Sequence, residues 1–166
     1  MAIPGNMWLY DDGGALIKGG CDVQHREYSI EFKGFHHNLS TPTDNLTGKP
    51  TGKRIHSPMM IVKEFDYSSP YLYKAVATGQ ALQKAELKFY KINDAGLEAE
   101  YFNILLEGVR IVSVSPAMAA PGDGLTGVLV WIRPKKLTKP TSTEAIQTSL
   151  RVSYSRSFFW RNSVWN

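Results

Sequence analysis

Residues 68–114 read SSPYLYKAVATGQALQKAELKFYKINDAGLEAEYFNILLEGVRIVSV, and they contain in unbroken order a helix start, a helix stop and a hairpin. Ser69 can cap a helix that begins at Pro70, because the fixed φ angle of proline suits the first helical turn. Gly79 follows where a left-handed closing residue is needed, so the sequence predicts a helix over residues 70–78. Its apolar face combines Leu72, Ala75 and Val76. A helix this short needs a sheet to pack against.

The residues after the helix predict a β-hairpin. Apolar and polar residues alternate over residues 85–92, which is the period of a half-buried strand. The sequence NDAG at 93–96 is a turn signal between this strand and the next. In the returning strand we expect Glu98 and Glu100 to face water. The residues expected to point inward are Tyr101, Ile104, Leu105 and Leu106.

Further segments also have the pattern of strands. They are residues 7–10, 28–35, 58–65, 109–114 and 128–132. In the second of these we expect Tyr28, Ile30 and Phe32 to share the inward face. Gly108 marks either a β-bulge or the start of the strand over 109–114.

Several motifs resemble the Hcp family, the tube-forming proteins of bacterial type VI secretion. In the segment quoted above they are SSPYLYKAV (68–76), TGQ (78–80), YKINDAG (90–96) and EYFN (100–103). Nearer the N-terminus they are MAIP (1–4), WL (8–9), DDGG (11–14), IKG (17–19), PTDN (42–45) and HSP (56–58). The resemblance covers residues 1–115.

The resemblance implies a fold and a structural function. The expected fold is a mainly β domain spanning residues 1–166, an antiparallel β-barrel or a sandwich of two sheets with one short α-helix packed on its side. Six subunits would close into a ring through head-to-tail contacts, and rings would stack into the tube that a contractile sheath expels. The implied partners are other copies of the chain, the tube tip protein, the sheath and small effector proteins carried inside the ring.

Residues 38–57 form a long polar segment that is rich in Thr, Gly, Pro, Asn, Lys and Arg. A loop of this length inside a compact domain is uncommon and is usually functional or disordered. In the Hcp family the corresponding loop reaches neighbouring subunits, so the resemblance implies the same use here. The residues expected to contact another subunit are Asp44, Asn45, Lys49, Lys53, Arg54 and His56.

Composition limits the class of protein. With 166 residues, 43% apolar and 20% charged, the chain suits one soluble globular domain. No stretch approaches the roughly 20 apolar residues that cross a bilayer, so we expect no membrane association. Asp11 and Asp12 come too early for a signal peptide, and we expect synthesis in the cytoplasm followed by export through type VI secretion. Cys21 is the only cysteine, which excludes an internal disulfide.

The C-terminal quarter differs from the rest of the chain in charge. Residues 125–166 carry a balance of +6 and residues 1–124 a balance of −2. Residues 116–166 also lack the closing hairpin typical of the family, so we interpret this end as diverged, recombined or frame-altered. We expect a loop over 115–127, a loop or extended chain over 133–142 because of Pro134 and Pro140, and then a strand within 150–160.

A second function remains open for this basic region, because small β-barrels can bind single-stranded nucleic acid with cations and stacking aromatic rings. The side chains concerned are Arg133, Lys135, Lys136, Lys139, Arg151, Arg156 and Arg161, near Phe158, Phe159 and Trp160.

The sequence offers no pattern of catalytic or cofactor chemistry. Residues 48–54 (GKPTGKR) have three residues between their glycines and lack the Ser or Thr that a phosphate-binding loop requires. His36 and His37 are adjacent, so on a strand they would point to opposite faces and could not share a metal. His25 and His56 have no suitably spaced partner. We therefore expect no enzyme activity, no cofactor and no metal site.

Overall fold

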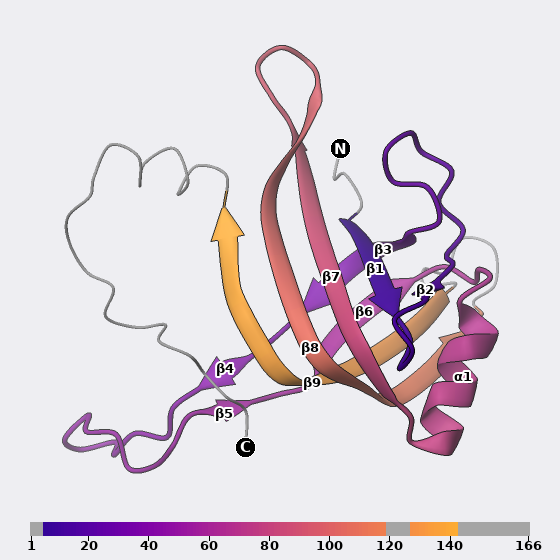
Figure 1. The fold of residues 1–166 in the computed structure, drawn as a ribbon. Helices are drawn as coiled ribbons and strands as arrows, with labels where there is room; N and C mark the ends of the chain where they lie inside the picture. The colour runs from indigo at the N-terminus through magenta and orange to yellow at the C-terminus, as the bar shows by residue number, and fades with distance from the viewer. Residues whose placement is uncertain (1–4, 119–126, 143–166) are drawn as a thin grey trace.

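The structure is a computed structural model that describes residues 5–118 and 127–142. Figure 1 shows long curved strands with a helix at one end and a narrow extension at the other. The elements in chain order are β1 Gly5–Tyr10, β2 Leu16–Ile17, β3 Ile30–His36, β4 Leu39–Ser40, β5 Ile55–His56, β6 Met59–Lys63, α1 Ser69–Thr78, β7 Ala81–Ile92, β8 Glu98–Ala117 and β9 Gly127–Ser142.

The main sheet closes on itself as an antiparallel barrel. Its order among the described strands is β1-β3-β6-β9-β8-β7, and β7 pairs back with β1, with Met7 opposite Leu87. The short β2 pairs antiparallel with the end of β1, and β4 and β5 form a separate two-stranded sheet. This arrangement confirms the predicted mainly β fold with a short helix on its side, and of the two alternatives the barrel is the one observed.

The interior is filled by the alternating residues that the sequence indicated, with three exceptions. Leu105 is only half-buried, because it lies between the inward Ile104 and Leu106 on the other face of β8. Ile30, Phe32 and Leu87 are buried. Tyr28 lies outside β3 and is 55% exposed, because its backbone bonds to Gly19 and Cys21 in a loop where its φ angle is 62°. Tyr101 is exposed as well, because the pairing of β7 with β8 shifts register between Phe89 and Tyr90 and Phe102 packs on the core instead.

The helix was predicted correctly at its end and one residue late at its start. Gly79 adopts the left-handed conformation, and its N–H donates to the carbonyl oxygens of Ala75 and Val76. The N-cap is Ser68, without a side-chain capping bond, so the predicted cap Ser69 is wrong. The Ser69 hydroxyl instead accepts hydrogen bonds from the Lys63 ammonium (3.1 Å) and the Asp66 N–H (3.2 Å).

Strands β7, β8 and β9 together form one bent wall of the barrel. At the bend, the regular alternation of inward and outward side chains is interrupted in all three strands. Inward residues there are three positions apart, in the rows Leu82–Val109–Pro134 and Ala85–Leu106–Leu137. Gly108 lies between these rows with a φ angle of 60°, and a Cβ added to it would lie 2.8 Å from the Lys135 Cβ. Neither predicted role of Gly108 is correct, because β8 is continuous and its register against β9 shifts elsewhere, between Asn103 and Leu105 and between Ile111 and Ser113.

Of the two alternatives for residues 133–142, extended chain is the one observed and the loop is wrong, because β9 continues through both prolines to Ser142. β6 pairs with β9 only from Val128 to Ile132, so the rest of β9 has β8 alone as a described partner. Proline is tolerated on such an edge because its missing N–H is not needed there. β8 likewise extends into the predicted loop, as far as Ala117. The strand predicted within 150–160 lies outside the described residues.

Candidate functional site

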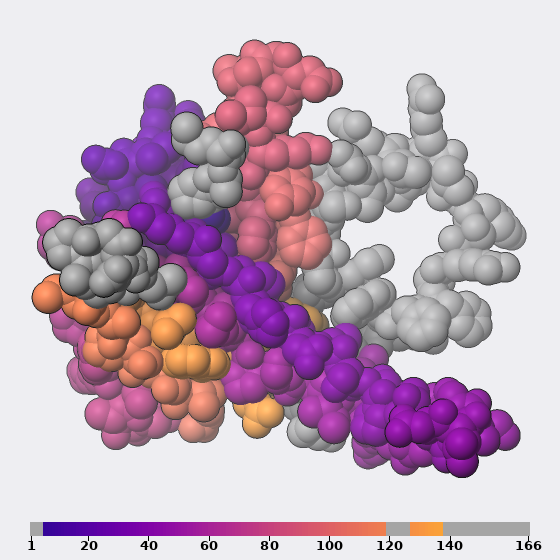
Figure 2. Space-filling model, turned by 180° about the vertical axis from the view of Figure 1, so that it is seen from behind, coloured from indigo at the N-terminus to yellow at the C-terminus, as the bar shows by residue number. Residues whose placement is uncertain are grey.

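The segment of residues 38–57 forms an arm that projects from the barrel. Figure 2 shows it as a narrow extension, and Figure 1 shows its two sides leaving the barrel together. Its sides are joined near the barrel by the β4–β5 pairing, with Leu39 opposite His56, and farther out by a bridge between Thr43 and Pro50. The arm is therefore an ordered ribbon and not only a polar loop.

The tip of the arm is held by one carboxylate. Asp44 Oδ1 accepts hydrogen bonds from the N–H groups of Leu46 and Thr47, both at 2.8 Å. These bonds, with one from the Thr47 side chain, lower the pKa of Asp44, since they favour the charged form. Gly48, with a φ angle of 68°, then turns the chain so that the Asp44 N–H reaches the Lys49 carbonyl at 2.9 Å.

The root of the arm contains two stacked histidines. The rings of His37 and His56 lie 5.9 Å apart between centroids, with an interplanar angle of 14°. Burial, the neighbouring His37 and Arg54 lower the pKa of His56 to about 4, and burial together with His36 lowers the pKa of His37. Both rings are therefore neutral near pH 7. The sequence had offered no partner for His56, because the pairing of the arm's two sides creates this contact.

The predicted contact residues occupy three parts of the arm. Asp44, Asn45 and Lys49 are at the tip, Lys53 and Arg54 are exposed on the returning side, and His56 is at the root. Asp44 and His56 thus stabilise the arm itself. Leu46, which the prediction omitted, is 97% exposed at the tip. With a single chain described, the contact of these residues with another subunit stays a prediction.

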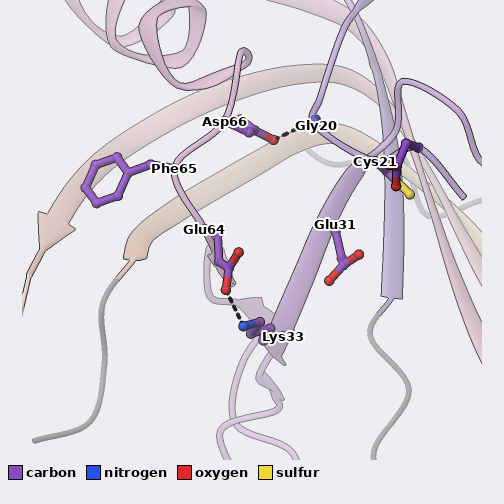
Figure 3. A pocket seen from close by; sticks show the side chains of 8 residues that line it. Gly20, Cys21, Glu31, Lys33, Glu64, Phe65 and Asp66 are labelled. Carbon is purple, nitrogen blue, oxygen red and sulfur yellow. Dashed lines mark hydrogen bonds and ion pairs between the residues drawn. The ribbon is translucent and has the colours of Figure 1, made fainter. Parts of the chain in front are cut away.

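A pocket of about 160 Å³ lies where β3 begins and β6 ends (Figure 3). Lys33 and Glu64 form an ion pair at its rim, and the Gly20 N–H donates to Asp66 Oδ2 at 3.3 Å. The other Asp66 oxygen accepts from the buried Lys63 ammonium at 2.8 Å. The polar groups of this pocket thus connect β3, β6 and the start of α1.

The residues singled out for chemistry do not converge on one site. Within residues 5–118 and 127–142, no group of three or more His, Cys, Asp or Glu side chains could hold a metal ion. The glycines of residues 48–54 lie in the arm, and the next element after them is the strand β5 and not the helix that a phosphate-binding loop requires. No helix in the described part of the chain is long and apolar enough to cross a bilayer.

The basic C-terminal residues are only partly described. Arg133, Lys135 and Lys136 are exposed on β9, where Lys136 pairs with Glu107 at 2.8 Å. The side chains of Lys139, Arg151, Arg156, Arg161, Phe158, Phe159 and Trp160 lie outside the described part. The nucleic-acid hypothesis for this region therefore stays a prediction.

Comparison with known proteins gives consistent results. The family model described as type VI secretion system effector, Hcp, matches residues 6–156, and so extends past residue 115, where the resemblance seen in the sequence ended. A relative named Major exported protein, from Pseudomonas aeruginosa, is 37% identical over 127 residues, which are 71% of this chain and 74% of that protein.

Two solved structures extend the similarity to three dimensions. A variant of Hcp1 from the E. coli EAEC 042 pathovar is 55% identical, with a TM-score of 0.79 over 87% of this chain and 94% of that one. The secreted protein Hcp3 from Pseudomonas aeruginosa is 25% identical, with a TM-score of 0.66 over 81% of this chain and 87% of that one.

Proposed function

The chain belongs to the Hcp family of type VI secretion proteins, and we propose that six copies close into a ring through the arm of residues 38–57 and stack into a tube. Membership of the Hcp family supports the ring and the tube in general. The arm is the observation that carries the proposal for this chain, because it projects from the barrel and most of its residues are exposed.

The arm has the properties of a preformed contact element. Its sides are paired, and its tip is fixed by the Asp44 carboxylate. Ordering before contact lowers the entropic cost of association. Leu46 offers an exposed apolar anchor, while Lys49 and Lys53 offer positive charge beside it. A contact between such an arm and a different surface of the next copy is heterologous, and rings arise when that contact closes.

The proposal assigns the chain a structural role in secretion and no catalysis. It places synthesis in the cytoplasm and export by the secretion machinery, and the relative named Major exported protein supports the export. The contractile sheath, the tube tip protein and small effectors are the proposed partners. Nucleic-acid binding by the basic C-terminal region remains the alternative.

The test is the mass of the purified chain in solution by light scattering, with electron micrographs of the same sample. We expect a hexamer and annular particles. Reversing two arm charges, in Lys49→Glu/Lys53→Glu, should shift the population towards single chains, because like charges at a contact are repulsive.

The matched control is Lys18→Glu/Lys74→Glu, which makes the same charge change on exposed residues outside the arm. It should assemble as the unmodified chain does. Equal assembly by both double variants would overturn the role of the arm, and a single chain at every concentration of the unmodified protein would overturn the ring.

A further inference from the structure

A basic groove of about 610 Å³ lies between the root of the arm and the bent wall of the barrel. Strands β5, β7, β8 and β9 all contribute to it. Its lining residues are Arg54, Ile55, His56, Ala81, Gly108, Arg110, Arg133, Pro134 and Lys135.

The described residues leave the positive charge of the groove uncompensated. None of its described lining residues is acidic, and within the described chain none of its four Arg and Lys side chains has an ion-pair partner. Two guanidinium groups are oriented by backbone oxygens. Arg110 donates to the Gly79 carbonyl at 3.0 Å, and Arg133 donates to the His56 carbonyl at 3.4 Å. An oriented guanidinium retains further N–H donors for a carboxylate.

Strand edges also border the groove. β5 pairs with β4 alone, and from Arg133 onwards β9 pairs with β8 alone, among the described strands. Backbone N–H and C=O groups on such edges can bond an extended peptide as an added strand. Pro134 lacks an N–H donor, so pairing along this edge of β9 is interrupted there.

We propose that this groove binds an extended acidic peptide segment of a partner protein. Carboxylates on alternate residues of an added strand project to one face, where the four cations would meet them. Ile55, which is exposed, supplies apolar surface for the aliphatic part of the peptide's side chains. The described lining contains no Phe, Tyr or Trp, so it lacks the stacking surface that single-stranded nucleic acid uses.

The experiment uses the full chain and a fluorescein-labelled peptide of about ten residues in which Glu and Thr alternate, the length of a short added strand. Fluorescence anisotropy at low salt should show binding, while the peptide with Gln in place of Glu should not bind. Lys135→Gln and Arg133→Gln should each weaken binding about tenfold, as expected for loss of a charge-assisted contact.

Lys136→Gln is the matched control. Lys136 is next to Lys135 in the sequence but lies outside the groove, and its substitution by Gln removes the same charge. It should change the affinity less than about twofold, the scale of a screened rim charge. Equal weakening by Lys135→Gln and Lys136→Gln would overturn the site, since net charge alone would then explain binding. Absence of peptide binding, or tighter binding of a labelled oligothymidine, would overturn the acidic peptide as ligand. Because Arg54, Ile55 and His56 belong to the arm, binding is measured at dilutions where the chain is single and no other copy covers the groove.

Discussion

The barrel and the arm use the same antiparallel pairing but derive their stability from different sources. In the barrel, long strands enclose buried apolar residues such as Met7, Ile61 and Leu106, so each pairing is supported by burial. The arm has two strands of two residues and no buried core of its own. Its order depends on the Asp44 tip and the stacked histidines. We therefore propose that the barrel is stable by itself and that the arm serves contact with another copy.

The largest expected effect is in the barrel, at the buried ion pair of Lys63 and Asp66. Lys63 is fully buried, and its ammonium bonds to Asp66, Ser69 and the Glu64 carbonyl. Asp66→Ala would leave that charge uncompensated, so the free energy of unfolding in urea should fall by about 3–5 kcal/mol.

Glu64→Ala is the control for that prediction, because it breaks the neighbouring pair with Lys33, whose side chains are 60% and 65% exposed. It should cost about 0–1 kcal/mol. If both variants lost the same stability, the buried pair would have no special role in joining β6 to α1.

A smaller effect compares two glycines with similar backbone angles, Gly108 in the barrel bend and Gly48 at the arm tip. Gly108→Ala should lower the free energy of unfolding by about 1–3 kcal/mol, because it adds backbone strain and a close contact with Lys135. A Cβ added at Gly48 would have no atom within 4 Å apart from those of Gly48 and its two chain neighbours. Gly48→Ala should leave the unfolding midpoint unchanged and only accelerate amide exchange at the tip. A midpoint shift of the same size in both variants would contradict the separation of arm and barrel.

Acid should loosen the arm root before it unfolds the barrel. The pKa of His56 is about 4 in the folded chain and 6.5 ordinarily, so the frayed arm binds the proton more tightly than the folded arm. Stability of the root is therefore complete above pH 6.5 and decreases as pH falls towards about 4, by roughly 1 kcal/mol for this partly exposed group. Hydrogen exchange of the Ser57 amide, which donates to the Asn38 carbonyl across the arm root, measures the stability of the root at several pH values. His56→Leu should reduce the pH dependence to the smaller part that His37 contributes, and an undiminished pH dependence would exclude His56 as the main cause.

The smallest expected effect is at the arm tip. Asp44→Ala removes the acceptor for the Leu46 and Thr47 N–H groups, so these amides should exchange faster while the unfolding midpoint stays constant. Asp44→Asn keeps an oxygen acceptor and should restore most of the protection. Unchanged exchange in Asp44→Ala would show that the tip is held by other means.

The sequence predicted the features that depend on near neighbours. Gly79 ended the helix and residues 93–96 formed the hairpin turn, because both signals are complete within a few residues. The sequence could not choose between loop and extended chain for β9 beyond Pro134, since the choice depends on where β6 stops pairing. Closure of the barrel by β1 and β7 also joins residues distant in sequence.

The same distinction applies to the candidate site. The polar composition of residues 38–57 indicated a projecting segment, but not the pairing that orders it. The contact of His37 with His56 and the gathering of Arg54, Arg110, Arg133 and Lys135 around one groove arise from strands that meet only in the folded chain. The interrupted alternation of inward side chains on both sides of Gly108 also arises from the pairing of three strands, so the sequence of β8 alone does not predict it.

We propose that the barrel is stable alone while the arm is built to be covered by another copy. Hydrogen exchange of the backbone amides, measured on the assembled protein and after dilution to single chains, tests it most directly. We expect barrel amides to be protected in both samples, and amides of residues 41–54 to be protected only in the assembled one. Equal exchange of the arm amides in the two samples would contradict the claim.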